Sequence, residues 1–208
     1  MDGKRQPAHF LSEALMSREL VSQLKTLFNH RYARNITYRA MARADAFPLF
    51  QATQDPEFNR YLLWNAPLQE RDVLPQVDKL LREATMDKTV VLSMGEKDTG
   101  TWLGLALLKP FRDGLELSLY LHPKRWNTGS VFVCGRGIIE AVFEAFPHLP
   151  MYVRIHPKNR RMERICLAYR FEPADGDTAQ HATQGTLDLL VYRLEKAHWE
   201  PFPDVQEY

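Results

Sequence analysis

A strand, a short loop and a helix are expected in succession within Leu115–Phe146, and this segment constrains the fold more than any other. In its first part, apolar residues alternate with polar or aromatic ones, which is the pattern of a strand with one buried face. Pro123 ends this strand, and beyond the loop apolar residues recur at helical spacing. We therefore expect a strand over residues 115–121 and a helix over residues 129–146.

The loop between this strand and this helix has the features of an anion-binding site. It contains Asn127, Thr128 and Gly129, which tolerate tight turns or a left-handed backbone. The first N–H groups of a helix have no internal acceptor, and the helix dipole favours negative charge there. Lys124 and Arg125 add positive charge to the same loop. The sequence therefore indicates either a phosphate or pyrophosphate site or an ordinary connection between a strand and a helix.

The composition is typical of one globular domain. The chain has 208 residues, of which 45% are hydrophobic, and this is enough for a sizeable core. The formal net charge of +1 argues against a nucleic-acid partner. Cys134 and Cys166 lie in helical patterns, and the seven histidines show no metal-ligand spacing. Because no signal-peptide pattern and no apolar run of membrane-spanning length is visible, we expect a cytoplasmic protein with neither a membrane nor a metal partner.

The rest of the chain alternates helical and strand patterns in an order typical of a mixed α/β domain. Asp45 and Asp55 are the expected N-caps of two short helices. Residues 29–35 are expected to be a basic connector, and residues 173–185 a mobile loop. Further helices are expected over residues 10–28, 43–51, 55–64, 71–85 and 159–168, and strands over residues 36–41, 89–94, 101–109, 151–155 and 187–194.

We divide the chain into an N-terminal helical extension (1–35), one domain (36–195) and a C-terminal tail (196–208). The helix of the extension can pack on its own domain or form a contact in a homodimer. Amphipathic helices are commonly docked on the domain that carries them, and we expect this arrangement here.

The segment described first resembles the acetyl-CoA-binding core of the GNAT N-acetyltransferases, in the branch of ribosomal-protein N-terminal acetyltransferases. In that branch a strand that carries a Glu ends in Pro, followed by a basic or polar residue, Trp, Gly, any residue and Gly. Here Glu116–Pro123 and Lys124–Gly129 fall in the same register. The family's closing motif, an Asn followed by a helix and Gly-Phe, is matched by Asn159 and Phe171.

Three positions depart from the family pattern. Asn127 and Arg170 stand where the family usually has Gly. Asn is the non-Gly residue that best tolerates positive φ, so the loop can keep its shape, whereas Arg170 is expected to change its turn. Cys166 replaces a Tyr that many relatives place on the last helix.

The resemblance implies a single GNAT-like α/β domain with a mixed, mostly antiparallel sheet, helices on both faces and an extra N-terminal helix. It also implies acetyl-CoA as the co-substrate, with loop amides holding the pyrophosphate, and no metal. The residues expected to contact this co-substrate are Leu119, Leu121, Lys124, Arg125, Trp126, Asn127, Thr128, Gly129, Ser130, Asn159, Arg161 and Met162.

The reaction that the resemblance implies requires an amine that has lost its proton. Glu116 matches the family's carboxylate and is either the base or an exposed strand residue paired with a nearby Lys or Arg. Ser118 lies beside the expected path of the thioester, where it either forms a hydrogen bond or only occupies its place in the sheet. Tyr169 and Tyr120 are the candidate proton donors, because a Cys donates only weakly. Trp64 and Glu116 are the candidates for contact with the acceptor.

We therefore expect an acetyl-CoA-dependent N-acetyltransferase that acts on a primary amine, preferably that of a protein or peptide. A small-molecule amine is the first alternative, although no acidic cluster dense enough for a polycation is visible. A catalytically weak module that binds coenzyme A and acts through a partner is the second. Acetylation of aminoacyl-tRNA is a third idea, against which the near-neutral charge argues.

Overall fold

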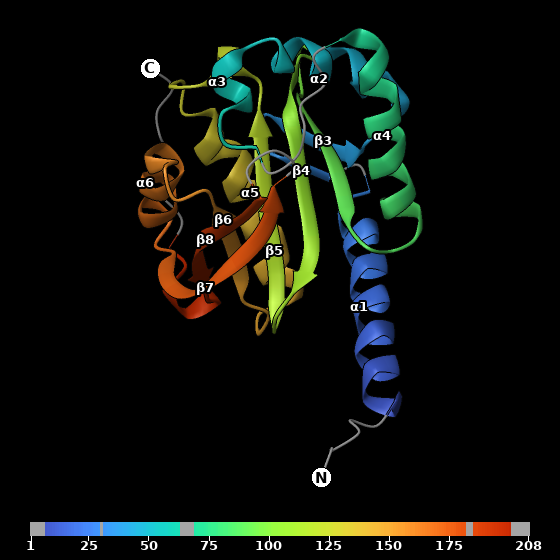
Figure 1. Cartoon of the computed structure of the whole chain (residues 1–208), viewed down its shortest axis with the longest axis vertical. Coiled ribbons are helices and arrows are strands. Elements are labelled where there is room, and N and C mark those ends of the chain that lie inside the picture. Colours follow the sequence, from blue (N-terminus) through green and yellow to red (C-terminus); the bar gives the residue numbers. More distant parts are fainter. Residues whose placement is uncertain (1–6, 30, 63–68, 182–184, 201–208) are drawn as a thin grey trace.

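The computed structural model describes residues 7–29, 31–62, 69–181 and 185–200, and their strands form one eight-stranded sheet (Figure 1). The strand order is β1-β2-β3-β4-β5-β6-β8-β7, and β5–β6 is the parallel pair in this otherwise antiparallel sheet. The strands are β1 (Arg31–Ala33), β2 (Ile36–Ala40), β3 (Val90–Glu96), β4 (Trp102–Phe111), β5 (Gly114–Leu121), β6 (Met151–Ile155), β7 (Glu172–His181) and β8 (Gly185–Leu194). The helices are α1 (Pro7–Leu27), α2 (Ala46–Thr53), α3 (Pro56–Asn59), α4 (Glu70–Thr85), α5 (Ser130–Ala145) and α6 (Arg160–Ala168). The expected mixed, mostly antiparallel sheet is confirmed.

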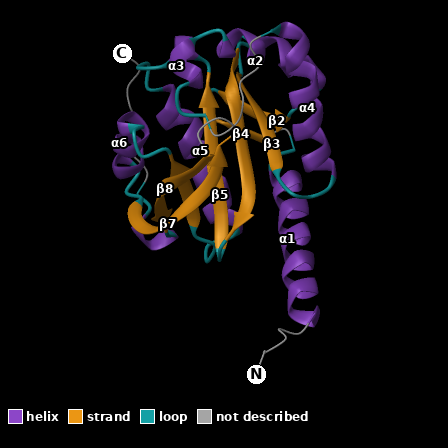
Figure 2. Cartoon of the chain, in the orientation of Figure 1, coloured by secondary structure: helices purple, strands orange, loops and turns teal. Residues whose placement is uncertain are grey.

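Helices cover both faces of this sheet (Figure 2). The larger core joins the sheet to α1, α5 and α6, and a second core joins it to α2 and α4. The central strand β4 contributes to both, with Leu103 and Leu108 in the larger core and Leu105 in the second. This agrees with its nearly continuous apolar sequence, which is typical of a strand covered on both faces.

The N-terminal helix packs on its own domain, as expected. Val21 and Leu24 of α1, and Phe28 directly after it, are buried in the larger core. In Figure 1 the N-terminal half of α1 extends beyond the end of the sheet. The C-terminal half therefore anchors the helix by burying apolar surface.

Two segments that were expected to be loops are strands. Most of the expected mobile loop 173–185 forms β7, which pairs with β8 and has a register shift between Ala174 and Asp177. The basic connector 29–35 contains β1, which pairs with β2. Both strands lie at edges of the sheet. Edge strands commonly carry polar and charged residues, so the alternation that marks a strand is weak there.

The two expected N-caps behave differently. Asp55 caps α3 by accepting a hydrogen bond from the Glu57 amide at 2.8 Å, although α3 is shorter than expected. Asp45 makes no capping bond to α2. Its buried carboxylate instead accepts hydrogen bonds from the Arg39 guanidinium and, at 2.9 Å, from the Ser93 hydroxyl. A buried charge needs such partners, and this requirement outweighs the local capping preference.

Within the described ranges, no helix is long and apolar enough to cross a membrane, and no group of three or more His, Cys, Asp and Glu side chains could hold a metal ion. Cys134 and Cys166 are buried free thiols. Burial raises the pKa of each thiol to about 12, so both stay protonated and unreactive near neutral pH.

Candidate active site

The two parallel strands separate soon after their pairing begins. β5 and β6 pair at Leu115–Met151 and at Glu116–Tyr152, and the ladder ends there. On its other side β5 stays paired with β4 as far as Leu121. We call the opening between β5 and β6 the fork. Toward the C-terminal ends of both strands, no described strand pairs with the main-chain groups of β5 that face β6.

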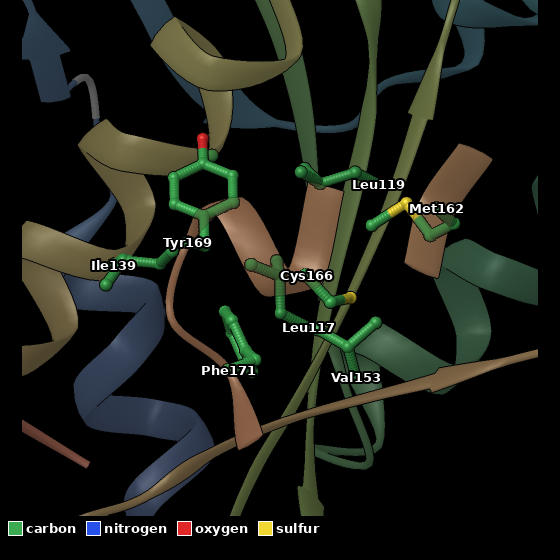
Figure 3. Close-up of a pocket in the computed structure, with 9 residues that line it drawn as sticks. Leu117, Leu119, Ile139, Val153, Met162, Cys166, Tyr169 and Phe171 are labelled. Atoms are coloured by element: carbon green, nitrogen blue, oxygen red, sulfur yellow. The ribbon is translucent and has the colours of Figure 1, made fainter. Parts of the chain in front are cut away.

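An apolar cavity lies beside the fork, between one face of β5 and β6 and the helices α5 and α6 (Figure 3). Leu119 and Val153 line it from β5 and β6, and Met162 and Cys166 line it from α6. Its volume is about 10 Å³, close to the space that one water molecule occupies. Because the Cys166 thiol is protonated and enclosed by apolar groups, it acts here as a small core residue.

The loop after β5 has the backbone shape that a glycine-rich loop would have. Asn127 and Gly129 both adopt positive φ, 61° and 78° respectively. The indole Nε1 of Trp126 donates a hydrogen bond to the Leu121 carbonyl at 3.0 Å. The Thr128 hydroxyl lies 2.7 Å from that of Ser130. The loop therefore keeps its turn although Asn replaces Gly, as expected.

This loop places the N-terminus of α5 at the open end of the fork. Gly129 is the N-cap and supplies no side-chain acceptor, so the first N–H groups of α5 remain available to a ligand. Lys124 and Arg125 lie in the short turn before the loop. The Arg125 charge is already paired with Glu96 at 2.8 Å, so this arginine is less available to a ligand than the sequence suggests.

The start of α6 forms the other border of the open end. The Asn159 side chain caps α6 by accepting a hydrogen bond from the Met162 amide at 3.1 Å. Arg161 reaches back to the loop after β5, where its guanidinium contacts Trp126 and Asn127. The structure thus brings together the loop residues, Asn159, Arg161 and Met162 around one opening.

The turn after α6 also keeps the shape that the family's Gly would give. Arg170 has a φ of 64°, and the Phe171 amide donates to the Cys166 carbonyl at 2.9 Å. The expectation that Arg170 changes this turn is therefore wrong. A left-handed backbone at a non-Gly residue lowers the free energy of unfolding by about 1 kcal/mol.

Replacing Arg170 with Gly is expected to stabilise the protein by about 1 kcal/mol, because Gly adopts this φ without strain. Thermal unfolding should show a midpoint about 3 °C higher than that of the unchanged protein. Arg170→Ala is the matched control, since it also removes the exposed ion pair with Glu200 but keeps the strain. Equal midpoints for the two variants would contradict the prediction.

A cluster of charges surrounds Glu116 on the opposite face of β5 from the cavity. Its carboxylate is only 3% exposed and lies 3.0 Å from the Lys109 ammonium and 2.9 Å from the Arg154 guanidinium. Arg154 also pairs with Asp177 at 2.5 Å. Glu116 is thus paired with a Lys and an Arg, but it is buried, whereas a paired Glu116 was expected to be exposed.

Three residues of this cluster, Arg154, Lys109 and Asp177, were not expected from the sequence, although the strand pattern held part of the signal. Glu116 pairs with Tyr152 in the parallel ladder. Side chains two residues apart share a face, so Arg154 had to lie on the same face as Glu116. Asp177 was hidden because its segment was expected to be a loop.

The strand β7 contacts this charge cluster and the turn beside it. The Arg112 guanidinium, in the β4–β5 turn, donates hydrogen bonds to the main-chain carbonyls of Asp175 and Gly176 at 2.9 and 3.0 Å. These carbonyls lie at the register shift of β7. The shift changes the direction of the side chains that follow it, and the Asp177 carboxylate pairs with the Arg154 guanidinium. Bulges near functional sites commonly redirect side chains in this way.

The remaining candidates lie in different places. Ser118 is half-buried, two residues from Glu116 on the same strand. Tyr169 is buried, and its hydroxyl donates to the carbonyls of Val131 and Phe132 at 3.0 and 2.7 Å. Burial raises the pKa of Tyr169 well above its usual value. Trp64, the candidate for contact with the acceptor, lies outside the described residues.

Two histidines at the open end of the fork were also missed. His122 follows β5 and His156 follows β6, each within a His-Pro-Lys sequence. In each turn the imidazole Nδ1 accepts the amide hydrogen two residues later, at Lys124 (3.2 Å) and at Lys158 (3.1 Å). The repeated sequence was the available signal. An imidazole that accepts at Nδ1 carries its proton on Nε2 when it is neutral.

Comparisons with solved structures place this fold among acetyltransferases. A GCN5-related N-acetyltransferase from Brucella melitensis is 15% identical, with a TM-score of 0.70, over 81% of this chain and 79% of that one. A microcin C7 self-immunity acetyltransferase, solved with acetyl-CoA and AMP, is 14% identical, with a TM-score of 0.66, over 78% and 93%. A ribosomal-protein-S5-alanine acetyltransferase from Vibrio fischeri is 10% identical, with a TM-score of 0.62, over 82% and 98%. The TM-scores show a shared fold, and at sequence identities this low the likeness shows the fold alone.

A search among curated proteins found no match. The family model described as an acetyltransferase (GNAT) domain matches residues 35–172, which is more than half of the chain. Enzymes of that family use acetyl-CoA and typically acetylate an amine. The fork, the loop and the match together lead to one conclusion: this chain belongs to the GNAT acetyltransferase family.

Proposed function

We propose that this protein transfers the acetyl group of acetyl-CoA to the primary amine of a protein or peptide. The observation that carries the proposal is the fork with the N-terminus of α5 at its open end. A helix N-terminus suits a pyrophosphate, and beyond Glu116 no described strand pairs with the β6 side of β5, which leaves this edge of the strand to a flexible amide-bearing arm. The family membership supports the same reaction.

The residues present fit coenzyme A. The N–H groups of Asn127–Ser130 would hold the pyrophosphate, with Lys124 adding charge. Leu119, Leu121 and Met162 would border the arm, and Asn159 would fix the start of α6 beside it. When bound, acetyl-CoA supplies an acetyl group activated as a thioester.

The chain's own groups then have two tasks. A main-chain N–H of β5 that faces into the fork can donate to the oxygen on which charge develops. The amine must lose a proton, and we assign its acceptance to Glu116, through water, because the neighbouring Lys109 borders solvent. Ser118 lies on the same strand and would orient the amine. For Tyr169 we propose a packing role, because its proton is given to two carbonyls of α5.

A protein or peptide acceptor is favoured over a small amine by two structural neighbours whose names refer to ribosomal-protein acetyltransferases. The partner-module alternative loses its main support. It relied on Asn127, on Arg170 and on the absence of the Tyr that Cys166 replaces. Asn127 and Arg170 both adopt the positive φ that Gly would adopt, so the absent Tyr is the feature that still favours this alternative.

We expect acetyl-CoA and coenzyme A to bind the purified protein with micromolar dissociation constants, because the loop and α5 are already shaped for the pyrophosphate. Calorimetric titration checks this. Turnover is then compared on peptides with a free N-terminal Ala or Ser, on the same peptides with a blocked N-terminus, and on polyamines. Turnover of free peptides alone supports the proposal. Absent binding refutes it, and turnover restricted to polyamines refutes the protein acceptor.

A further inference from the structure

The side chain of Arg161 spans the open end of the fork. Arg161 lies in the first turn of α6, which follows β6, whereas Trp126 and Asn127 lie in the loop that follows β5. Its guanidinium carbon lies 4.8 Å from the centre of the Trp126 ring, and its Nη2 donates to Asn127 Oδ1 at 3.2 Å. Because β5 and β6 are parallel, both following segments lie at the same end of the sheet. This contact therefore bridges the opening.

The partners of Arg161 differ from those of the arginines beside it. Arg160, its neighbour in the sequence, pairs with the Glu163 carboxylate at 2.7 Å. Arg125, in the turn before the loop, pairs with Glu96. Arg161 has an aromatic face and a neutral amide oxygen as its recorded partners in the described structure. Among the described residues, its charge is thus held in place by groups other than a carboxylate.

A phosphate would be a stronger partner than either of these groups. A phosphate oxygen carries negative charge, so its hydrogen bond to the guanidinium gains the attraction of two opposite charges, which a neutral amide oxygen does not supply. The planar guanidinium can also offer two parallel N–H groups to a phosphate. Asn127 belongs to the loop whose amides face the proposed pyrophosphate, so this group would arrive beside the present partner of Arg161. An exchange of partners is therefore favourable and needs only a side-chain movement.

We propose that Arg161 is a latch on the fork, which Asn127 and Trp126 hold closed and which transfers to the pyrophosphate of coenzyme A as that ligand enters. The inference rests on the proposed function, because it requires that coenzyme A bind in the fork. One side chain then has two effects. Its contact with Asn127 slows entry of the ligand, and its contact with the pyrophosphate slows escape.

The first test measures binding by Arg161→Gln, with Arg160→Gln as the matched control in the same helical turn. Calorimetry is run with coenzyme A, with dephospho-coenzyme A, which lacks the 3′-phosphate, and with pantetheine at millimolar concentration. We expect Arg161→Gln to weaken binding of coenzyme A and of dephospho-coenzyme A by about tenfold and to leave pantetheine unchanged. Arg160→Gln should stay within about twofold of the unchanged protein for all three ligands.

The second test removes the other half of the latch. Asn127→Gly deletes the acceptor oxygen and keeps a residue that adopts positive φ easily. Stopped-flow measurement should show coenzyme A associating about fivefold faster, as expected from loss of one hydrogen bond. In the Arg161→Gln background the same change should have no further effect on the association rate.

The outcomes separate the latch from the proposed function. Failure of the unchanged protein to bind coenzyme A overturns both. Binding by the unchanged protein with equal affinity for Arg161→Gln overturns the latch alone. An equal loss for pantetheine shows that Arg161 only shapes the loop, which also overturns it. A loss for coenzyme A but not for dephospho-coenzyme A overturns the assignment to the pyrophosphate. An unchanged association rate for Asn127→Gly overturns the closing role of Asn127.

Discussion

Glu116→Gln is expected to lower kcat by about 100-fold while leaving the affinity for coenzyme A within about twofold. The amide keeps the shape of the side chain but cannot take a proton from the acceptor amine. The proposed cofactor site lies at the open end of the fork, whereas Glu116 belongs to the last paired position of β5 and β6, so cofactor binding should be spared. Steady-state rates on the best acceptor and calorimetry with coenzyme A check both parts.

The cluster around Glu116 requires a control for its electrostatic role. In Glu116→Gln, Arg154 retains Asp177, but Lys109 loses its recorded carboxylate partner. Asp177→Asn removes the other carboxylate from Arg154 and leaves Glu116 with both cations. We expect Asp177→Asn to keep at least about a third of the normal kcat. If both variants lose activity equally, or if Glu116→Gln keeps its rate, then Glu116 serves the ion-pair cluster and is not the base.

The local motifs were predictable because they depend on neighbours in sequence. The strand–loop–helix over residues 115–146 follows from apolar spacing, Pro123 and the glycine-like loop, and the structure reproduces it closely. The N-cap role of Asn159 is equally local. Asn127 shows the same principle, because its tolerance of positive φ could be stated before the fold was known.

The contacts around Glu116 were not predictable in the same way because they join distant parts of the chain. Lys109, Arg154 and Asp177 come from β4, β6 and β7, and only the strand pairing brings them together. The polar sequence of β7 concealed a strand, so its contribution to the cluster could not be foreseen. Arg125 is a similar case, since its pairing with Glu96 of β3 reduces the charge that the loop appears to carry.

Gly135→Ala is expected to destabilise the protein by about 2 kcal/mol, although Ala normally favours a helix interior. A Cβ at residue 135 would lie 2.6 Å from the hydroxyl oxygen of Tyr169. The Tyr169 ring has little room to withdraw, because it packs against Phe132 and stacks on Trp199 at 5.8 Å. Urea unfolding of the purified variant measures the loss.

The cause of that loss can be isolated with a double-mutant cycle. Tyr169→Phe removes the oxygen atom that the added Cβ would meet, so it should restore about 1 kcal/mol in the Gly135→Ala background while costing about 1 kcal/mol alone. Gly137→Ala is the matched control on the same helix, since its Cβ would meet Tyr38 at 2.4 Å and not Tyr169. Additive effects of Gly135→Ala and Tyr169→Phe would show that the close contact is not the cause. A large fall in kcat for Tyr169→Phe, with unchanged affinity for the cofactor, would instead restore Tyr169 as the proton donor. A residue that only packs would not lower kcat while leaving the cofactor affinity unchanged.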